Sequence, residues 1–160
     1  MAGNEQETHE CDVLVVGSGC AGLSAAVTAG HQGAKVLVVE KEPRFGGTTA
    51  RSGGWLWIPG TSLARDWGIV EAPDQARTYL RHQAGNSFDA ARVDAFLSTG
   101  PEAVDFFTTK TAVRFDMPLT FPDYDAEAPG GAQGGRSTPT NWARTSGISA
   151  HPFPNSRCSA

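Results

Sequence analysis

Three glycines near the amino terminus form the segment whose residue types and spacing are most indicative of chemistry. They lie in the run GSGCAG, which occupies residues 17–22 and follows an apolar stretch. Gly17 lets the backbone turn sharply out of a strand, Gly19 removes a Cβ where an anion must approach the main chain, and Gly22 permits close packing of a helix. The unpaired N–H groups that open a helix attract negative charge. The run therefore predicts a phosphate-binding turn.

The flanking elements have the order that such a turn requires. Residues 12–16 are a short β-branched run typical of a strand buried on both faces of a parallel sheet, and an alanine-rich helical stretch follows the glycines. Residues 36–39 repeat the strand pattern and lead into Glu40. A carboxylate at this spacing accepts hydrogen bonds from ribose hydroxyls. Strand, turn, helix, strand and acid together predict a dinucleotide-binding βαβ unit.

A second glycine-rich stretch bears on which dinucleotide is bound. Residues 45–54, FGGTTARSGG, bring main-chain N–H groups and Thr and Ser hydroxyls directly after the second strand, and Arg51 can offset anionic charge. These groups suit an extended cofactor that crosses the top of the sheet. A nicotinamide site does not need such a segment, so it favours FAD over NAD.

Several segments resemble the fumarate reductase/succinate dehydrogenase-type FAD flavoproteins, and within that group the 3-ketosteroid Δ1-dehydrogenases. They are DVLVVGSGCAGLSAA, VVEK, FGGTTARSGGWLWIPG, FPDYDAEAPGG and GGRS, and the resemblance covers about residues 11–137. It implies an α/β fold: a Rossmann-like FAD-binding βαβ unit of a doubly wound sheet, incomplete here, with additional helices. It also implies FAD contacts at Gly17, Gly19, Ala21, Gly22, Glu40, Lys41, Gly46, Gly47, Thr48, Ser52 and Gly53.

Tyr124, in the segment FPDY, is the candidate catalytic residue of the chain. By the resemblance, its hydroxyl supports a second tyrosine that removes a proton from the substrate. A phenol has a pKa of about 10, so proton removal near neutrality needs a stabilised phenolate. The alternative is a surface-loop tyrosine with a solvated hydroxyl. Asp125 follows where the family often has another aromatic residue.

The resemblance implies 1,2-desaturation of a 3-ketosteroid, with a proton removed beside the carbonyl and a hydride passed to the flavin. The family's proton-abstracting tyrosine and its carboxy-terminal FAD motif have no counterpart in these 160 residues. Whether this chain is itself an enzyme therefore stays open. The alternatives are a fumarate reductase-like flavoprotein acting on an enoate and an inactive, truncated FAD-binding fragment. We expect the chain alone to retain FAD weakly, to be poorly soluble and to show no turnover.

The remaining pattern predicts a polar tail at 1–10, the amino-terminal part of an FAD-binding domain at 11–136 and an irregular tail at 137–160. Helices are expected at 73–83, at 88–98 after a Ser87 cap and at 101–109, with a strand at 113–115. Residues 55–59, WLWIP, are interpreted as core packing, with cavity lining as the alternative. Because the tail lacks periodicity and stops resembling the family near Thr138, we hypothesise a reading-frame change there, which sequencing the gene would test.

Composition limits the partners. The net charge is −4, which gives no support for a nucleic-acid surface. The four histidines lack metal-ligand spacing, so no metal is expected, and the expected partner is a small steroid-like or enoate substrate. No apolar run reaches membrane-spanning length, and the start MAGNEQETHE does not read as a signal peptide. The cysteines form no CxxC pair, so we expect the cytoplasm. Cys20 is either a tolerated small residue, which we favour, or a thiol activated by the helix dipole.

Overall fold

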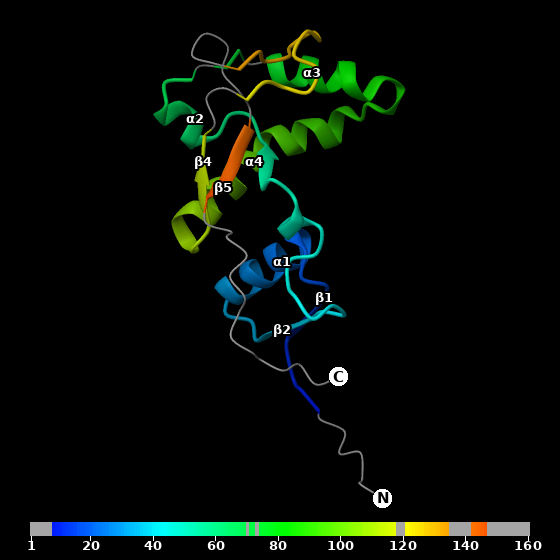
Figure 1. Cartoon of the computed structure of the whole chain (residues 1–160), viewed down its shortest axis with the longest axis vertical. Helices are drawn as coiled ribbons and strands as arrows, with labels where there is room; N and C mark the ends of the chain where they lie inside the picture. The colour runs from blue at the N-terminus through cyan, green and yellow to red at the C-terminus, as the bar shows by residue number, and fades with distance from the viewer. Residues whose placement is uncertain (1–7, 70, 73, 118–120, 135–141, 147–160) are drawn as a thin grey trace, which may run out of the picture. The chain divides into compact units, whose positions relative to one another are not determined.

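Two short runs of valine and leucine form parallel strands in the amino-terminal part of the chain. The computed structural model describes residues 8–69, 71–72, 74–117, 121–134 and 142–146. In it, β1 (Val13–Val16) pairs in parallel and residue for residue with β2 (Val36–Val39), and α1 (Cys20–His31) connects them (Figure 1). A Cβ at Gly22 would collide with the Gly17 carbonyl oxygen, so the start of the helix lies directly against the end of the strand. The predicted βαβ arrangement is present.

The two faces of this small sheet differ in how well they are covered. Val15 is 8% exposed, and its Cγ1 lies 3.2 Å from where a Gly22 Cβ would stand, so it faces α1. Its neighbours on the strand, Leu14 and Val16, are 56% and 80% exposed. Successive side chains of a strand point to opposite faces, so the face opposite α1 is open among the described residues. Parallel sheets are normally covered on both faces.

Residues 54–149 form a second compact unit, which we describe by itself. Its antiparallel sheet has the strand order β3 (Trp55–Trp57), β5 (Trp142–Ser146), β4 (Arg114–Asp116). Its helices are α2 (Ser62–Asp66), α3 (Gln75–Ala84) and α4 (Ala90–Lys110), and two 3₁₀ turns lie at Thr49–Arg51 in the first unit and Gly85–Ser87 in the second. In Figure 1, α3 and α4 run side by side. None of the helices in the described ranges is both long and apolar enough to cross a membrane.

The core of this unit lies between its sheet and its helices. Ala64, Val104, Phe115 and Met117 are its buried residues. Leu56 and Ile58 pack against them, which supports the interpretation of the WLWIP segment as core rather than cavity lining.

The prediction of two helices broken at Gly100-Pro101 is wrong. α4 is one helix that begins after the Asp89 cap, not Ser87, and contains Pro101. The pre-proline clash that normally ends a helix involves the Cβ of the preceding residue, and Gly100 has none. The hydroxyls of Ser98 and Thr99 donate to the Ala95 carbonyl oxygen, at 3.0 and 2.7 Å, in the turn that precedes Pro101.

Other boundaries shift, and one predicted loop contains a strand. The strand expected at 113–115 is β4, which lies one residue later, at Arg114–Asp116. The helix expected at 73–83 is α3, which begins at Gln75, and Pro73 lies outside the described residues. Residues 142–146 form β5 between β3 and β4, which corrects the expectation of an irregular tail at that point. The rest of 137–160 is outside the described residues, and the reading-frame hypothesis stays a hypothesis.

Candidate cofactor-binding site

The glycine turn joins β1 to α1 in the conformation that the sequence predicts. Gly17 has φ +95°, a value that favours glycine, and its N–H donates to the Val39 carbonyl oxygen at 2.8 Å. Gly19 is the N-cap of α1, with φ −67° and ψ 179°, and offers no side chain to cap the helix. Apart from its own neighbours in the chain, no atom of the described residues would lie within 4 Å of a Cβ at Gly19. Neither backbone strain nor packing therefore requires a glycine here, and the space beside it is open.

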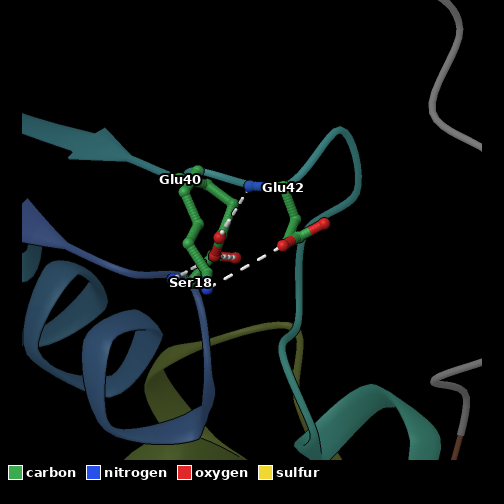
Figure 2. Close-up of polar contacts among 4 residues, drawn as sticks. Ser18, Glu40 and Glu42 are labelled. Atoms are coloured by element: carbon green, nitrogen blue, oxygen red, sulfur yellow. Dashed lines mark hydrogen bonds and ion pairs between the residues drawn. The ribbon is translucent and has the colours of Figure 1, made fainter.

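Glu40 is joined to the glycine turn by Ser18. One carboxylate oxygen of Glu40, Oε2, accepts from the Ser18 N–H at 2.8 Å and from the Ser18 hydroxyl at 2.5 Å (Figure 2). The other oxygen, Oε1, accepts from the Glu42 N–H at 3.1 Å. Ser18 is fully buried. The Glu40 carboxylate, directly after β2, is thus held in one orientation beside the glycine turn.

These hydrogen bonds keep the Glu40 carboxylate ionised. The Ser18 hydroxyl first, and then the N–H groups of Glu42 and Ser18, lower the pKa of Glu40 from 4.5 to about 2. Donors to a carboxylate favour its charged form. Because the folded pKa is lowered, the stabilisation is complete above pH 4.5 and is lost as the pH falls towards 2.

The second glycine-rich stretch lies against the first. The Gly46 N–H donates to the Ser18 hydroxyl at 2.9 Å, and the Cys20 N–H donates to the Thr49 hydroxyl at 3.2 Å. A Cβ at Gly47 would lie 3.5 Å from the Gly19 Cα. Residues 46–49 therefore lie beside the β1–α1 turn, and the two glycine-rich segments are adjacent in space.

The other predicted contact residues are largely exposed around this turn. Ala21 is exposed in the first turn of α1, Thr48 precedes the 3₁₀ turn at Thr49–Arg51, and Ser52 donates to the Thr49 carbonyl oxygen at 2.8 Å. The Lys41 ammonium lies 3.9 Å from a Glu42 carboxylate oxygen. Gly53 is the last residue of the first unit before the second begins. Their roles as FAD contacts stay predictions.

In the FPDY segment, the buried residue is the aspartate and not the tyrosine. Asp123 is 3% exposed, and its carboxylate accepts from the Trp57 indole N–H at 2.8 Å and the Ala132 N–H at 2.9 Å. Tyr124 is 85% exposed. Phe121 stacks on Trp55 with ring centroids 4.5 Å apart. The loop is thus anchored on both sides of Tyr124, whose catalytic role stays a prediction.

Glu71 is a buried carboxyl close to this anchor. One of its oxygens accepts from the Gly60 N–H, and the other is buried without a hydrogen-bond partner among the described residues. Burial raises the pKa of Glu71, and the negative charge of Asp123 adds to the rise. No group of three or more His, Cys, Asp or Glu side chains in the described part of the chain is placed to hold a metal ion, and the absence of a metal stays a prediction.

Sequence reasoning did not single out three residues that organise these segments: Ser18, Thr49 and Asp123. For Ser18 and Thr49, the signal that the sequence offers is a hydroxyl within a glycine-rich stretch. Their partners could not be identified from sequence because the paired groups lie 22 and 29 positions apart in the chain. In the FPDY segment the sequence pattern indicated Tyr124 as the functional residue and gave no signal for the burial of Asp123.

The strand, glycine turn, helix and acid define a dinucleotide-binding βαβ unit, and the second glycine-rich stretch that lies against it favours FAD. Residues 12–159 match the model of the family described as FAD binding domain, so the chain belongs to that family. FAD as the cofactor is confirmed.

The relatives also agree with the predicted resemblance. The chain is 47% identical over 133 residues to 4-oxocyclohex-2-ene-1-carboxylate 5-dehydrogenase of Sinomonas cyclohexanicum, covering 83% of this chain and 22% of the relative. It is 46% identical over 129 residues to 3-oxosteroid 1-dehydrogenase of Mycobacterium tuberculosis strain H37Rv, covering 81% and 23%. A solved structure of 3-ketosteroid Δ1-dehydrogenase from Sterolibacterium denitrificans superposes with a TM-score of 0.71 at 35% identity, covering 84% of this chain and 23% of that one. The chain therefore spans about a quarter of the length of these relatives.

Proposed function

We propose that the β1–α1 turn binds the diphosphate of FAD and that Glu40 binds its adenosine ribose. The observation that carries this assignment is the open space at Gly19. The residues on either side of Gly19 are held in place, since Ser18 bonds to Glu40 and Cys20 bonds to Thr49. The backbone N–H groups at the start of α1 supply donors and partial positive charge. Gly46, Gly47 and Thr48 extend the same cradle.

We also propose the doubly wound sheet of the flavoproteins for the complete domain. The parallel β1–β2 pair with its connecting helix supports this topology. For the compartment we propose the cytoplasm, on the cysteine pattern of the sequence.

The activity that we propose for the full-length protein is dehydrogenation of a ring carbon next to a ketone. The names of two of its relatives describe dehydrogenases of ring ketones, which supports this reaction class. FAD, when bound, is the hydride acceptor. The part of this chain in the reaction is to hold the cofactor and to present the Tyr124 hydroxyl, on an anchored loop, to the group that removes the substrate proton.

Two substrate classes are candidates. A 3-ketosteroid is supported by the relatives named as steroid dehydrogenases. A small cyclic keto acid is supported by a relative of slightly higher identity, whose name describes a single-ring ketone that carries a carboxylate. Both substrates share the ketone that acidifies the neighbouring C–H bond, so the same chemistry serves either one.

A chimera tests the activity and the role of Tyr124. Residues 12–134 would replace the matching segment of the Mycobacterium tuberculosis relative, and turnover would be measured with a 3-ketosteroid and with a 4-oxocyclohexane carboxylate. We expect Tyr124→Phe to lower kcat at least tenfold with little change in KM, since loss of acid–base support slows proton transfer by about 10²-fold or more.

The matched control is Tyr79, the other tyrosine of this chain. Tyr79 is buried, and its hydroxyl accepts from the Asp125 N–H at 3.4 Å. Tyr79→Phe should leave kcat within about threefold, because it removes one neutral hydrogen bond away from the chemistry. Equal losses of kcat in both variants would contradict a catalytic role for Tyr124. A flavin-loaded chimera that is inactive on both substrates would contradict the reaction class.

A further inference from the structure

Asp123 is a buried acidic side chain for which the proposed reaction has no direct use. Its Oδ1 accepts from the Trp57 indole N–H at 2.8 Å, and its Oδ2 accepts from the Ala132 N–H at 2.9 Å. The N–H of Asp123 donates in return to the Ala132 carbonyl oxygen at 2.8 Å. Ala132 is fully buried, so these bonds lie in the interior of the second unit. Asp123 therefore joins the two ends of the loop 123–132 to each other and to β3.

The anchor on the other side of Tyr124 is weaker. The Asp125 N–H donates to the Tyr79 hydroxyl at 3.4 Å, which is long for a hydrogen bond, and the Asp125 carboxylate accepts from the Gln83 side-chain amide at 3.0 Å on the surface. In Figure 1 the loop, coloured yellow to orange, runs beside α3. Tyr124 is 85% exposed, so packing holds its ring only weakly. The direction of its side chain therefore follows from the backbone that Asp123 holds.

We propose that Asp123 is a positioning residue, which fixes the loop backbone so that Tyr124 presents its hydroxyl in one direction to the proton-abstracting group of the full-length protein. This inference rests on the proposed function and adds the residue that orients Tyr124. Asp123 touches no reacting atom in this role. Misplacement of a catalytic group by about 1 Å can lower a rate about 10²-fold, so the restraint that Asp123 supplies bears directly on kcat.

An aspartate suits this role because the two N–H groups that it receives come from different segments of the chain. A carboxylate offers an oxygen to each of them, whereas the amide of asparagine offers one oxygen and one NH₂ group. Asp123→Asn keeps the size of the side chain but can accept from only one of the Trp57 and Ala132 N–H groups. The other N–H then faces a second donor and loses its hydrogen bond. The substitution therefore loosens the anchor with little change in volume.

The kinetic test uses the full-length, FAD-loaded chimera with a 3-ketosteroid and compares Asp123→Asn, Tyr124→Phe and the double variant. Asp123→Asn should lower kcat about tenfold and change KM by less than about threefold. Because Asp123 acts through Tyr124, the double variant should lose no more than about threefold beyond Tyr124→Phe. A residue that only stabilises the fold gives losses that multiply. The matched control is Asp94→Asn, at an exposed partner of Arg77 on α4, which should leave kcat within about twofold.

A measurement without turnover follows the anchor itself. In hydrogen–deuterium exchange of the 160-residue chain, Asp123→Asn should speed exchange within residues 121–134 about tenfold. Exchange in the β1–α1–β2 segment, which belongs to the other compact unit, should not change.

Trp57→Phe is a second variant, which decides the question if Asp123→Asn does not fold. It removes the indole donor and leaves both oxygens of Asp123 in place. It should lower kcat about threefold, again without multiplying the loss of Tyr124→Phe, because one neutral hydrogen bond of the anchor is lost.

The outcomes distinguish this inference from the proposed function. An unchanged kcat in Asp123→Asn, or losses that multiply with those of Tyr124→Phe, would overturn the positioning role and leave the role of Tyr124 standing. Unchanged exchange within 121–134 would show that Asp123 does not hold the loop. If the chimera turns over and Tyr124→Phe leaves kcat unchanged, the proposed role of Tyr124 fails, and the positioning role fails with it.

Discussion

At the residue scale, two glycines of the first unit differ in what explains them. Gly19 and Gly30 both have negative φ, and a Cβ at either position would meet no atom within 4 Å. Gly30 lies within α1, where a glycine weakens a helix, while Gly19 lies at the predicted diphosphate. The same substitution at the two positions therefore separates helix stability from cofactor binding.

We predict opposite outcomes for Gly30→Ala and Gly19→Ala. Gly30→Ala should raise the free energy of unfolding by about 0.5–1 kcal/mol and leave FAD binding unchanged. Gly19→Ala should lower stability by no more than about 1 kcal/mol, as alanine is a poorer N-cap, yet weaken FAD binding at least tenfold because its methyl group occupies the phosphate approach. Thermal unfolding and flavin fluorescence titration measure both quantities. Undiminished FAD binding by Gly19→Ala would place the diphosphate elsewhere.

At the element scale, α4 shows that a proline inside a helix depends on its neighbours. Gly100 is buried, and a Cβ there would lie 3.0 Å from the Ile58 Cγ2 as well as crowding the Pro101 ring. The glycine is therefore required both by the continuous helix and by packing against the segment that follows β3. This pair of constraints explains why a proline-based rule for ending helices failed at this position.

Substitutions at this pair should change stability in opposite directions. Pro101→Ala restores a main-chain donor in the helix interior and should raise the free energy of unfolding by about 1–3 kcal/mol, less what the ring contacts contribute. Gly100→Ala should lower it by a similar amount through the contact with Ile58 and the pre-proline clash. Denaturant unfolding measures both changes. Stabilisation by Gly100→Ala would mean that α4 does not run unbroken through Pro101.

At the scale of the whole molecule, the open face of the β1–β2 sheet explains the poor solubility expected of the chain. Leu14 and Val16 expose large parts of apolar side chains that a parallel sheet normally buries. The relatives are about four times as long as this chain, and further layers of a doubly wound sheet are what such a face accommodates.

Adjacent valines of β1 provide the test of this view. Val16→Thr should leave stability within about 0.5 kcal/mol and reduce binding of a hydrophobic dye, because the 80% exposed side chain contacts little. Val15→Thr places a hydroxyl between the strand and α1 and should cost about 1–2 kcal/mol. Circular dichroism and dye fluorescence report the two effects. Equal destabilisation by both changes would show that the outer face is covered.

The local pattern alone was enough to predict the βαβ unit, the glycine turn and the acid at the end of β2. Each depends on neighbours in sequence: a continuous β-branched run, a φ that only glycine adopts readily, and a spacing set by one helix. The FAD assignment followed from the second glycine-rich stretch and the resemblance, and the family match confirmed it.

Only the tertiary structure revealed the partners that are distant in the chain. Ser18 meets Glu40 and Gly46, Asp123 rather than Tyr124 lies buried, and residues 142–146 become a strand between β3 and β4. The physical reason is the same each time. A buried polar group or an unpaired strand must find a partner, and which partner it finds depends on where the chain returns in space, which local periodicity does not encode.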